Sequence, residues 1–87
     1  MTFIYALADP ETDEVRYVGK ADCVKERYAS HLREAKSGKQ SHKCNWIRQV
    51  INKDQKPKLI VLEEVSHEDW KNAEIYYIEQ FKKLGHR

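Results

Sequence analysis

The chain has 87 residues, which limits it to one domain with a modest hydrophobic core. Hydrophobic residues make up 40% of the sequence and charged residues 34%, a composition typical of a folded globule and too apolar for a disordered chain. No apolar run approaches the roughly 20 residues of a membrane span, and residues 1–8 lack the features of a secretory signal. We therefore expect a cytoplasmic protein that has no membrane partner.

The formal net charge of +2 conceals an uneven distribution along the chain. Residues 1–19 contain one basic and four acidic side chains. Residues 20–58 contain eleven basic and four acidic side chains, and residues 59–87 contain four basic and six acidic ones. A basic middle segment predicts one positive face suited to a polyanion backbone, although solvated helix faces would give the same pattern. The two cysteines, Cys23 and Cys44, form no C-x-x-C pair, so we expect free thiols and no structural zinc site.

The first expected element is a β-hairpin. Residues 2–8 (TFIYALA) and 15–19 (VRYVG) are rich in β-branched and aromatic residues. The segment 9–14 (DPETDE) between them has the Pro and Asp residues that favour a turn.

Two tyrosines are expected to face each other across this hairpin. A turn centred near Glu11 would place Tyr5 opposite Tyr17 on one face. Paired phenols on neighbouring strands can be simple packing. Gly19 on the same face would leave room for another group to approach the backbone, and Lys20 adds a cation beside the tyrosines.

A helical period follows from about Val24 to Lys36, where Asp22 could cap the start and Ser37-Gly38 the end. Arg27 and His31, four residues apart, are expected along the edge of its apolar stripe, which consists of Val24, Tyr28, Leu32 and Ala35. The stem of an arginine often covers apolar surface. Its planar fork also suits a phosphate group.

A second helix is expected over residues 43–52, followed by a strand over Lys58–Val65 (KLIVLEEV). The nearly continuous apolar run of that strand suits a position covered on both faces. Three residues at the start of the second helix are candidates for nucleic-acid contact or, alternatively, for cap and core positions: Lys43, Asn45 and Trp46.

The last expected helix runs from about residue 68 to 84, with Ser66 and Asp69 matching a capping box and Gly85 marking its end. Glu74 falls in the middle of its apolar face, which consists of Trp70, Ala73, Tyr77, Ile78, Phe81 and Leu84. A desolvated carboxylate is costly without a cation. We therefore expect Glu74 to pair with Arg27 or Lys20, or to bind a divalent metal ion.

The element order is ββααβα. It predicts an α+β domain in which a small three-stranded sheet, antiparallel or mixed, is flanked by three helices.

The candidate residues, taken in order, resemble the motifs of the GIY-YIG nuclease superfamily. The resemblance covers essentially the whole chain and rests on Phe3-Ile4-Tyr5, Tyr17-Val18-Gly19-Lys20, Arg27 and His31, and Glu74 in a C-terminal helix. Phe3 stands where the first motif usually has glycine. The family's asparagine, some residues beyond the glutamate, has no counterpart after Glu74, so we expect residues 1–87 to be a nuclease domain truncated at its C-terminus.

The resemblance implies a metal-dependent endonuclease that hydrolyses DNA phosphodiester bonds. Glu74 would bind Mg²⁺ or Mn²⁺, which would stabilise the leaving 3′ oxygen. Tyr17 would be the general base, assisted by Lys20 or His31, because a phenol has an ordinary pKa near 10. Arg27 would neutralise charge on the phosphate, and Tyr5 would position the water or the phosphate.

Three interpretations remain open from the sequence. The first is the endonuclease; the second is a catalytically silent nucleic-acid-binding module of the same fold, favoured by the missing asparagine. The third is a protein-interaction domain in which Tyr5, Tyr17 and Glu74 are only core and ion-pair residues. For the first, we expect a monomer whose parent protein has an additional DNA-binding domain, because a module this small has little surface for reading bases.

Overall fold

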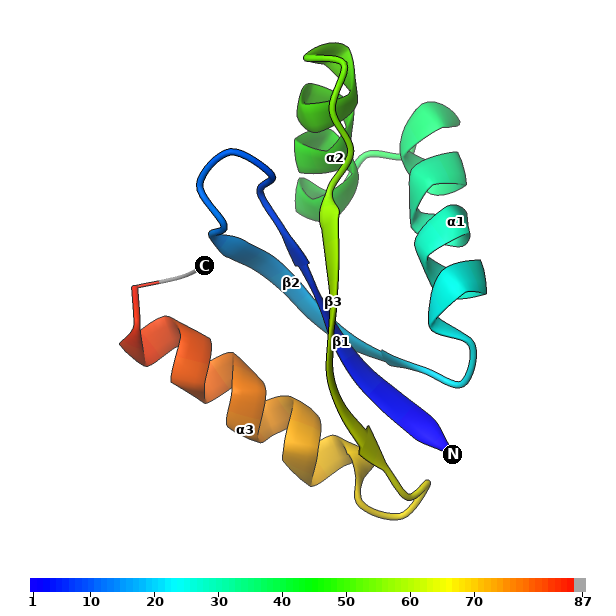
Figure 1. The fold of residues 1–87 in the computed structure, drawn as a ribbon. Coiled ribbons are helices and arrows are strands. Elements are labelled where there is room, and N and C mark those ends of the chain that lie inside the picture. The colour runs from blue at the N-terminus through cyan, green and yellow to red at the C-terminus, as the bar shows by residue number, and fades with distance from the viewer. Residues whose placement is uncertain (86–87) are drawn as a thin grey trace.

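A computed structural model describes residues 1–85. The chain forms three strands and three helices in the predicted order ββααβα (Figure 1). The elements are β1 (Thr2–Ala8), β2 (Val15–Ala21), α1 (Val24–Lys36), α2 (His42–Asn52), β3 (Lys58–Val65) and α3 (Trp70–Lys83). The predicted α+β class is confirmed, and within residues 1–85 no helix is long and apolar enough to cross a membrane.

The sheet is antiparallel throughout, in the order β2-β1-β3. β1 lies in the centre, which explains why nearly all its residues are buried. The prediction that β3 is covered on both faces is wrong. It is an edge strand, and Val61 is 54% exposed. Most of its apolar residues are therefore only partly buried.

The hairpin register differs from the predicted one by two residues. Tyr5 pairs with Gly19, and Leu7 pairs with Tyr17, so the two tyrosines are diagonal neighbours on one face. The loop explains the shift, because Asp13 adopts a left-handed conformation (φ 60°) and a bulge follows Leu7. A diagonal pair of large aromatic side chains still makes contact across two strands.

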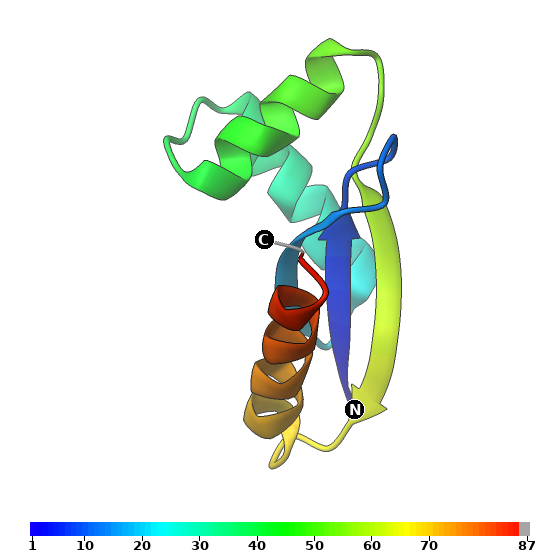
Figure 2. The ribbon, with the colours of Figure 1, turned by 90° about the vertical axis from the view of Figure 1, so that its left-hand side faces the viewer.

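The helices divide between the two faces of the sheet, with α3 on the side opposite α1 (Figure 1). The larger core packs α1 and α2 against Tyr5 and Leu7. The smaller core packs Phe81 of α3 against Ala6 and Ala8. Figure 2 shows the α1–α2 pair and α3 along different halves of the sheet. β2 contacts both α1 and α3.

Two predicted helix caps are not formed as expected. Cys23, not Asp22, is the N-cap residue of α1, because the Asp22 carboxylate accepts a hydrogen bond from the Thr2 hydroxyl (3.0 Å). The Ser66 hydroxyl bonds to the Asp69 carboxylate (3.0 Å) instead of to the backbone of α3. By contrast, the Ser41 hydroxyl caps α2 by accepting from the Cys44 amide (3.1 Å). Cys23 and Cys44 are free thiols, as expected.

Candidate active site

Three aromatic rings meet on the face of the sheet covered by α1. The ring centroids of Tyr5 and Tyr17 are 6.1 Å apart, and the His31 ring lies 6.0 Å from Tyr5 and 5.2 Å from Tyr17. The Tyr5 hydroxyl and the His31 Nε2 atom are joined by a buried hydrogen bond of 2.6 Å. The structure thus brings together three of the predicted site residues from β1, β2 and α1.

Gly19 allows the two phenol groups to converge. A Cβ atom at this position would lie 2.9 Å from the Tyr5 hydroxyl oxygen and 3.1 Å from that of Tyr17. It would also lie 2.8 Å from a carbon of the Tyr17 ring. The two distances below 3.0 Å are too short for a real Cβ and the third is tight, so the absence of a side chain lets both hydroxyls lie over the backbone of β2.

His31 lies in the centre of the buried face of α1 and not at its edge, contrary to the prediction. It is fully buried, whereas Leu32, expected at the centre, is only partly buried. Its hydrogen bond to Tyr5 offsets part of the cost of burying the imidazole. Burial, together with the nearby charges of Lys43 and Arg27, lowers the pKa of His31 to about 4, so the ring is neutral at neutral pH.

Arg27 lies one helical turn before His31, where its charge acts on both phenols. Its guanidinium is also 3.9 Å from the Glu34 carboxylate, and its side chain is 40% exposed. Arg27 therefore lies close to both tyrosines. A half-exposed cation next to two hydroxyl groups is available to an incoming anion.

Lys20 points toward α3 instead of toward the tyrosines. Its ammonium nitrogen is 4.6 Å from the centroid of the Trp70 ring, a cation–π contact. Lys20 and Arg27 nevertheless line the same open groove, of about 440 Å³, at the start of α1. Lys43 makes a cation–π contact with Tyr17, since its ammonium lies 5.3 Å from the ring centroid.

Glu74 is partly buried on α3, and the desolvated position predicted for it is wrong. None of the residues of α3 is fully buried, and Leu84, expected in the apolar face, is 73% exposed. Within residues 1–85, none of the ion pairs includes Glu74, so the predicted pairing with Arg27 or Lys20 is not formed.

The residues one turn before and one turn after Glu74 show which row of α3 borders β2. Trp70, one turn earlier, contacts Lys20. Ile78, one turn later, borders a pocket together with Val18. Residues four apart lie in one row on a helix, so Glu74 belongs to the row of α3 that borders β2.

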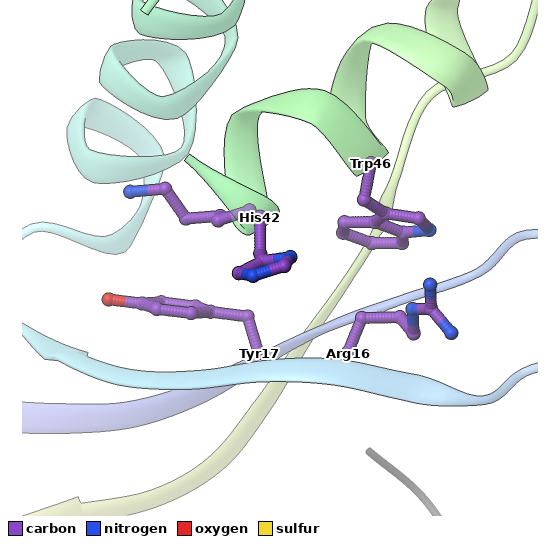
Figure 3. A pocket seen from close by; sticks show the side chains of 5 residues that line it. Arg16, Tyr17, His42 and Trp46 are labelled. Atoms are coloured by element: carbon purple, nitrogen blue, oxygen red, sulfur yellow. The ribbon is translucent and has the colours of Figure 1, made fainter. Parts of the chain in front are cut away.

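A pocket lies between β2 and the start of α2, directly beside Tyr17 (Figure 3). Lys43 and Trp46, both predicted nucleic-acid contacts, line it, whereas Asn45 is exposed and accepts a hydrogen bond from Arg48. Arg16 and His42 also line it and were not predicted. Strict alternation along β2 would direct Arg16 away from Tyr17, but Arg16 is the extra residue of the bulge between the Leu7–Tyr17 and Ala8–Val15 pairs. Its guanidinium lies 5.9 Å from the centroid of the Trp46 ring.

One comparison with known proteins identifies the family of the chain. A family model described as the GIY-YIG catalytic domain matches residues 1–87, the whole chain. Searches of curated proteins and of solved structures find no significant match to it. The match spans every element that carries a candidate site residue, and the chain therefore belongs to the GIY-YIG family of nuclease domains.

Proposed function

We propose that this chain is a metal-dependent endonuclease domain that hydrolyses phosphodiester bonds in DNA. The observation that carries the proposal is the convergence of the Tyr5 and Tyr17 hydroxyls over Gly19, with Arg27 beside them. Glu74, a carboxylate without a cation partner among residues 1–85, belongs to the row of α3 that borders β2.

The two tyrosines have different roles in this proposal. Burial, and then the proximity of Tyr17, raises the pKa of Tyr5, so its hydroxyl keeps its proton. In this proposal the Nε2–H of the neutral His31 donates to the Tyr5 oxygen, which leaves the single Tyr5 proton for a hydrogen bond to the phosphate or to the attacking water. Tyr17, on the edge strand and partly exposed, acts in its phenolate form as the general base that takes a proton from that water. The water oxygen then bonds to phosphorus as the bond from phosphorus to the 3′ oxygen breaks.

Cations around this pair bind and stabilise the phosphate. Arg27 donates to the phosphate oxygens and neutralises the charge that develops on them. Lys20, in the same groove, attracts the neighbouring backbone. His31, neutral and bonded to Tyr5, holds that phenol in place and does not itself carry charge to the site.

Glu74 can be a ligand of Mg²⁺ or Mn²⁺ because it is a carboxylate, although it is a single one. Residues 1–85 contain no group of three or more His, Cys, Asp or Glu side chains that could enclose a metal ion. Mg²⁺ does not need such a group, because it retains several waters and is commonly held by one or two carboxylates together with a substrate phosphate. An ion bound at Glu74 would supply charge for the leaving 3′ oxygen.

The test is cleavage of a labelled DNA in Mg²⁺ or Mn²⁺ by four variants. Tyr17→Phe, Arg27→Ala and Glu74→Ala are each expected to lower the rate by about 10²-fold or more, since each removes a group that acts in the transition state. Glu79→Ala is the matched control for Glu74→Ala, because Glu79 is an exposed carboxylate on the same helix. Circular dichroism would establish that the variants remain folded.

Full activity of Glu74→Ala would disprove the assignment of the metal site. Salt-sensitive DNA binding with no cleavage in any divalent ion would instead support the silent binding module of the same fold.

A further inference from the structure

The pocket between β2 and α2 has a lining suited to a nucleotide. It has a volume of about 440 Å³ and is lined by Arg16, Tyr17, His42, Lys43 and Trp46. Three of these side chains are aromatic rings and two are permanent cations, and the lining includes no carboxylate. Figure 3 shows side chains of β2 facing those of α2 across the cavity.

The ring–cation contacts within the lining indicate what the pocket can bind. The Arg16 guanidinium lies over Trp46 at 5.9 Å, and the Lys43 ammonium over Tyr17 at 5.3 Å. Each contact places a positive charge beside a flat apolar surface. A nucleobase offers a flat π surface and carries a phosphate on its sugar, so it matches both parts of the lining.

Most of the lining is held in place by contacts outside the cavity. Trp46 is only 6% exposed and belongs to the larger core. The Arg16 and Lys43 side chains form ion pairs with Glu14 (2.8 Å) and Glu34 (3.4 Å). His42 is exposed at the start of α2, which leaves its ring available for stacking at the rim.

We propose that this pocket binds one unpaired nucleobase next to the cleaved phosphate. The inference rests on the proposed endonuclease function, because Tyr17 belongs both to this pocket and to the pair of phenols. In an intact duplex, each base is stacked between its neighbours and cannot enter a side pocket without being flipped out. The substrate class is therefore DNA with an unpaired nucleotide at the cleavage position.

The experiment measures binding of the wild-type chain in EDTA, so that no cleavage is required. The probes are a labelled perfect duplex, the same duplex with one bulged 2-aminopurine nucleotide, and a version with an abasic bulge. Stacking of one base on aromatic side chains is worth about 1–3 kcal/mol, which corresponds to roughly 5- to 150-fold in affinity. We expect the chain to bind the bulge that carries a base more tightly than the abasic bulge, by a factor in this range. We also expect the 2-aminopurine fluorescence to be quenched on binding.

Substitutions at His42 separate stacking from charge. His42→Ala should lower the affinity for the bulged probe several-fold and leave that for the perfect duplex and the abasic bulge unchanged. His42→Phe, which keeps a ring, should retain the affinity for the bulge. His67→Ala, at another exposed histidine, is the control and should bind like the wild type.

Equal affinity of the wild type for the three probes would overturn the proposal. So would a His42→Ala variant that loses as much affinity for the abasic bulge as for the bulge that carries a base. These outcomes are distinct from a failure of the proposed function. A preference for the unpaired base without cleavage in Mg²⁺ would refute the endonuclease alone, whereas cleavage of a perfect duplex without that preference would refute the pocket alone.

Discussion

Tyr5 and Tyr17 illustrate how position in a sheet differentiates two identical side chains. Tyr5 belongs to the central strand and is fully buried, and this burial is the main reason that its pKa is raised. Tyr17 belongs to an edge strand and is partly exposed. Because an edge residue can be reached by solvent and substrate, the arrangement leaves one phenol to organise the site and the other to react.

His31 should make the stability of the domain depend on pH. In the folded chain the imidazole remains neutral down to about pH 4. In the unfolded chain it takes up a proton below its ordinary pKa near 6.5. The unfolded state therefore binds more protons at acidic pH, and stability should fall by about 3 kcal/mol between pH 7 and pH 4 from this group alone. Urea unfolding at several pH values would measure the change.

His31→Phe provides the comparison for that measurement, since it removes the titrating group but keeps an aromatic ring. Carboxylates contribute to acid unfolding in both proteins, so the difference between their pH profiles isolates His31. The wild type should lose more stability than the variant as the pH falls from about 6.5 to 4. Parallel profiles would contradict a neutral, buried imidazole.

Gly19→Ala should impair catalysis more than stability. The added Cβ would press on both phenols, and Tyr5 cannot yield because it is buried and bonded to His31. Tyr17 must therefore shift. We expect a loss of about 1–2 kcal/mol in unfolding free energy and a fall of roughly 10- to 100-fold in cleavage rate, because misplacing a catalytic group by about 1 Å is costly.

Val61→Ala is the control for this substitution, since Val61 is an exposed residue of β3. It should leave the cleavage rate unchanged. An unaltered rate for Gly19→Ala would show that the spacing of the two hydroxyls is unimportant.

At the scale of the elements, the sequence predicted local structure well because the signals are local. The strand over Thr2–Ala8 and the helix over Val24–Lys36 have the predicted bounds. Their periodicities and the turn residues between them are contained within each segment. The fold class followed from the order of these segments.

Properties that depend on neighbouring elements were predicted less well. The apolar run of β3 does not reveal that the strand lies at an edge, because this depends on which strand β1 pairs with. The hairpin register depended on the backbone conformation of Asp13. Asp22 could not cap α1 because Thr2, twenty residues away, is its partner.

The candidate site shows the same division. The motif order singled out Tyr5, Tyr17 and Arg27, which the structure brings close together. It did not predict the central burial of His31 or the partial exposure of Glu74, since both depend on how the helices pack on the sheet. Arg16 was missed because strict strand alternation does not anticipate the bulge at this residue.

At the scale of the whole molecule, two grooves of about 440 Å³ flank the catalytic candidates. One contains Arg16 and Lys43, between β2 and α2. The other, at the start of α1, contains three cations and two carboxylates, and its cations are Lys20, Arg27 and Arg33. Tyr17 borders the first groove and Arg27 the second, so a DNA strand that crosses the site would contact cations on both sides.

This path predicts which cations contribute to the salt dependence of DNA binding. Each lost phosphate contact should reduce the slope of log K against log salt concentration by about 0.7 for single strands and 0.9 for duplexes. Arg33→Gln, in the groove at α1, should reduce the slope by roughly this amount. Lys53→Gln removes an exposed cation that lines neither groove and should leave the slope unchanged.

Fluorescence anisotropy in EDTA between 50 and 200 mM salt would measure both slopes, since affinity changes steeply over this range. An equal reduction in the two variants would mean that the basic segment attracts DNA only through its diffuse charge. A reduction confined to Arg33→Gln would fix one end of the strand at the start of α1. Because Tyr17 and Arg27 lie between the two grooves, it would also orient the strand across the pair of phenols.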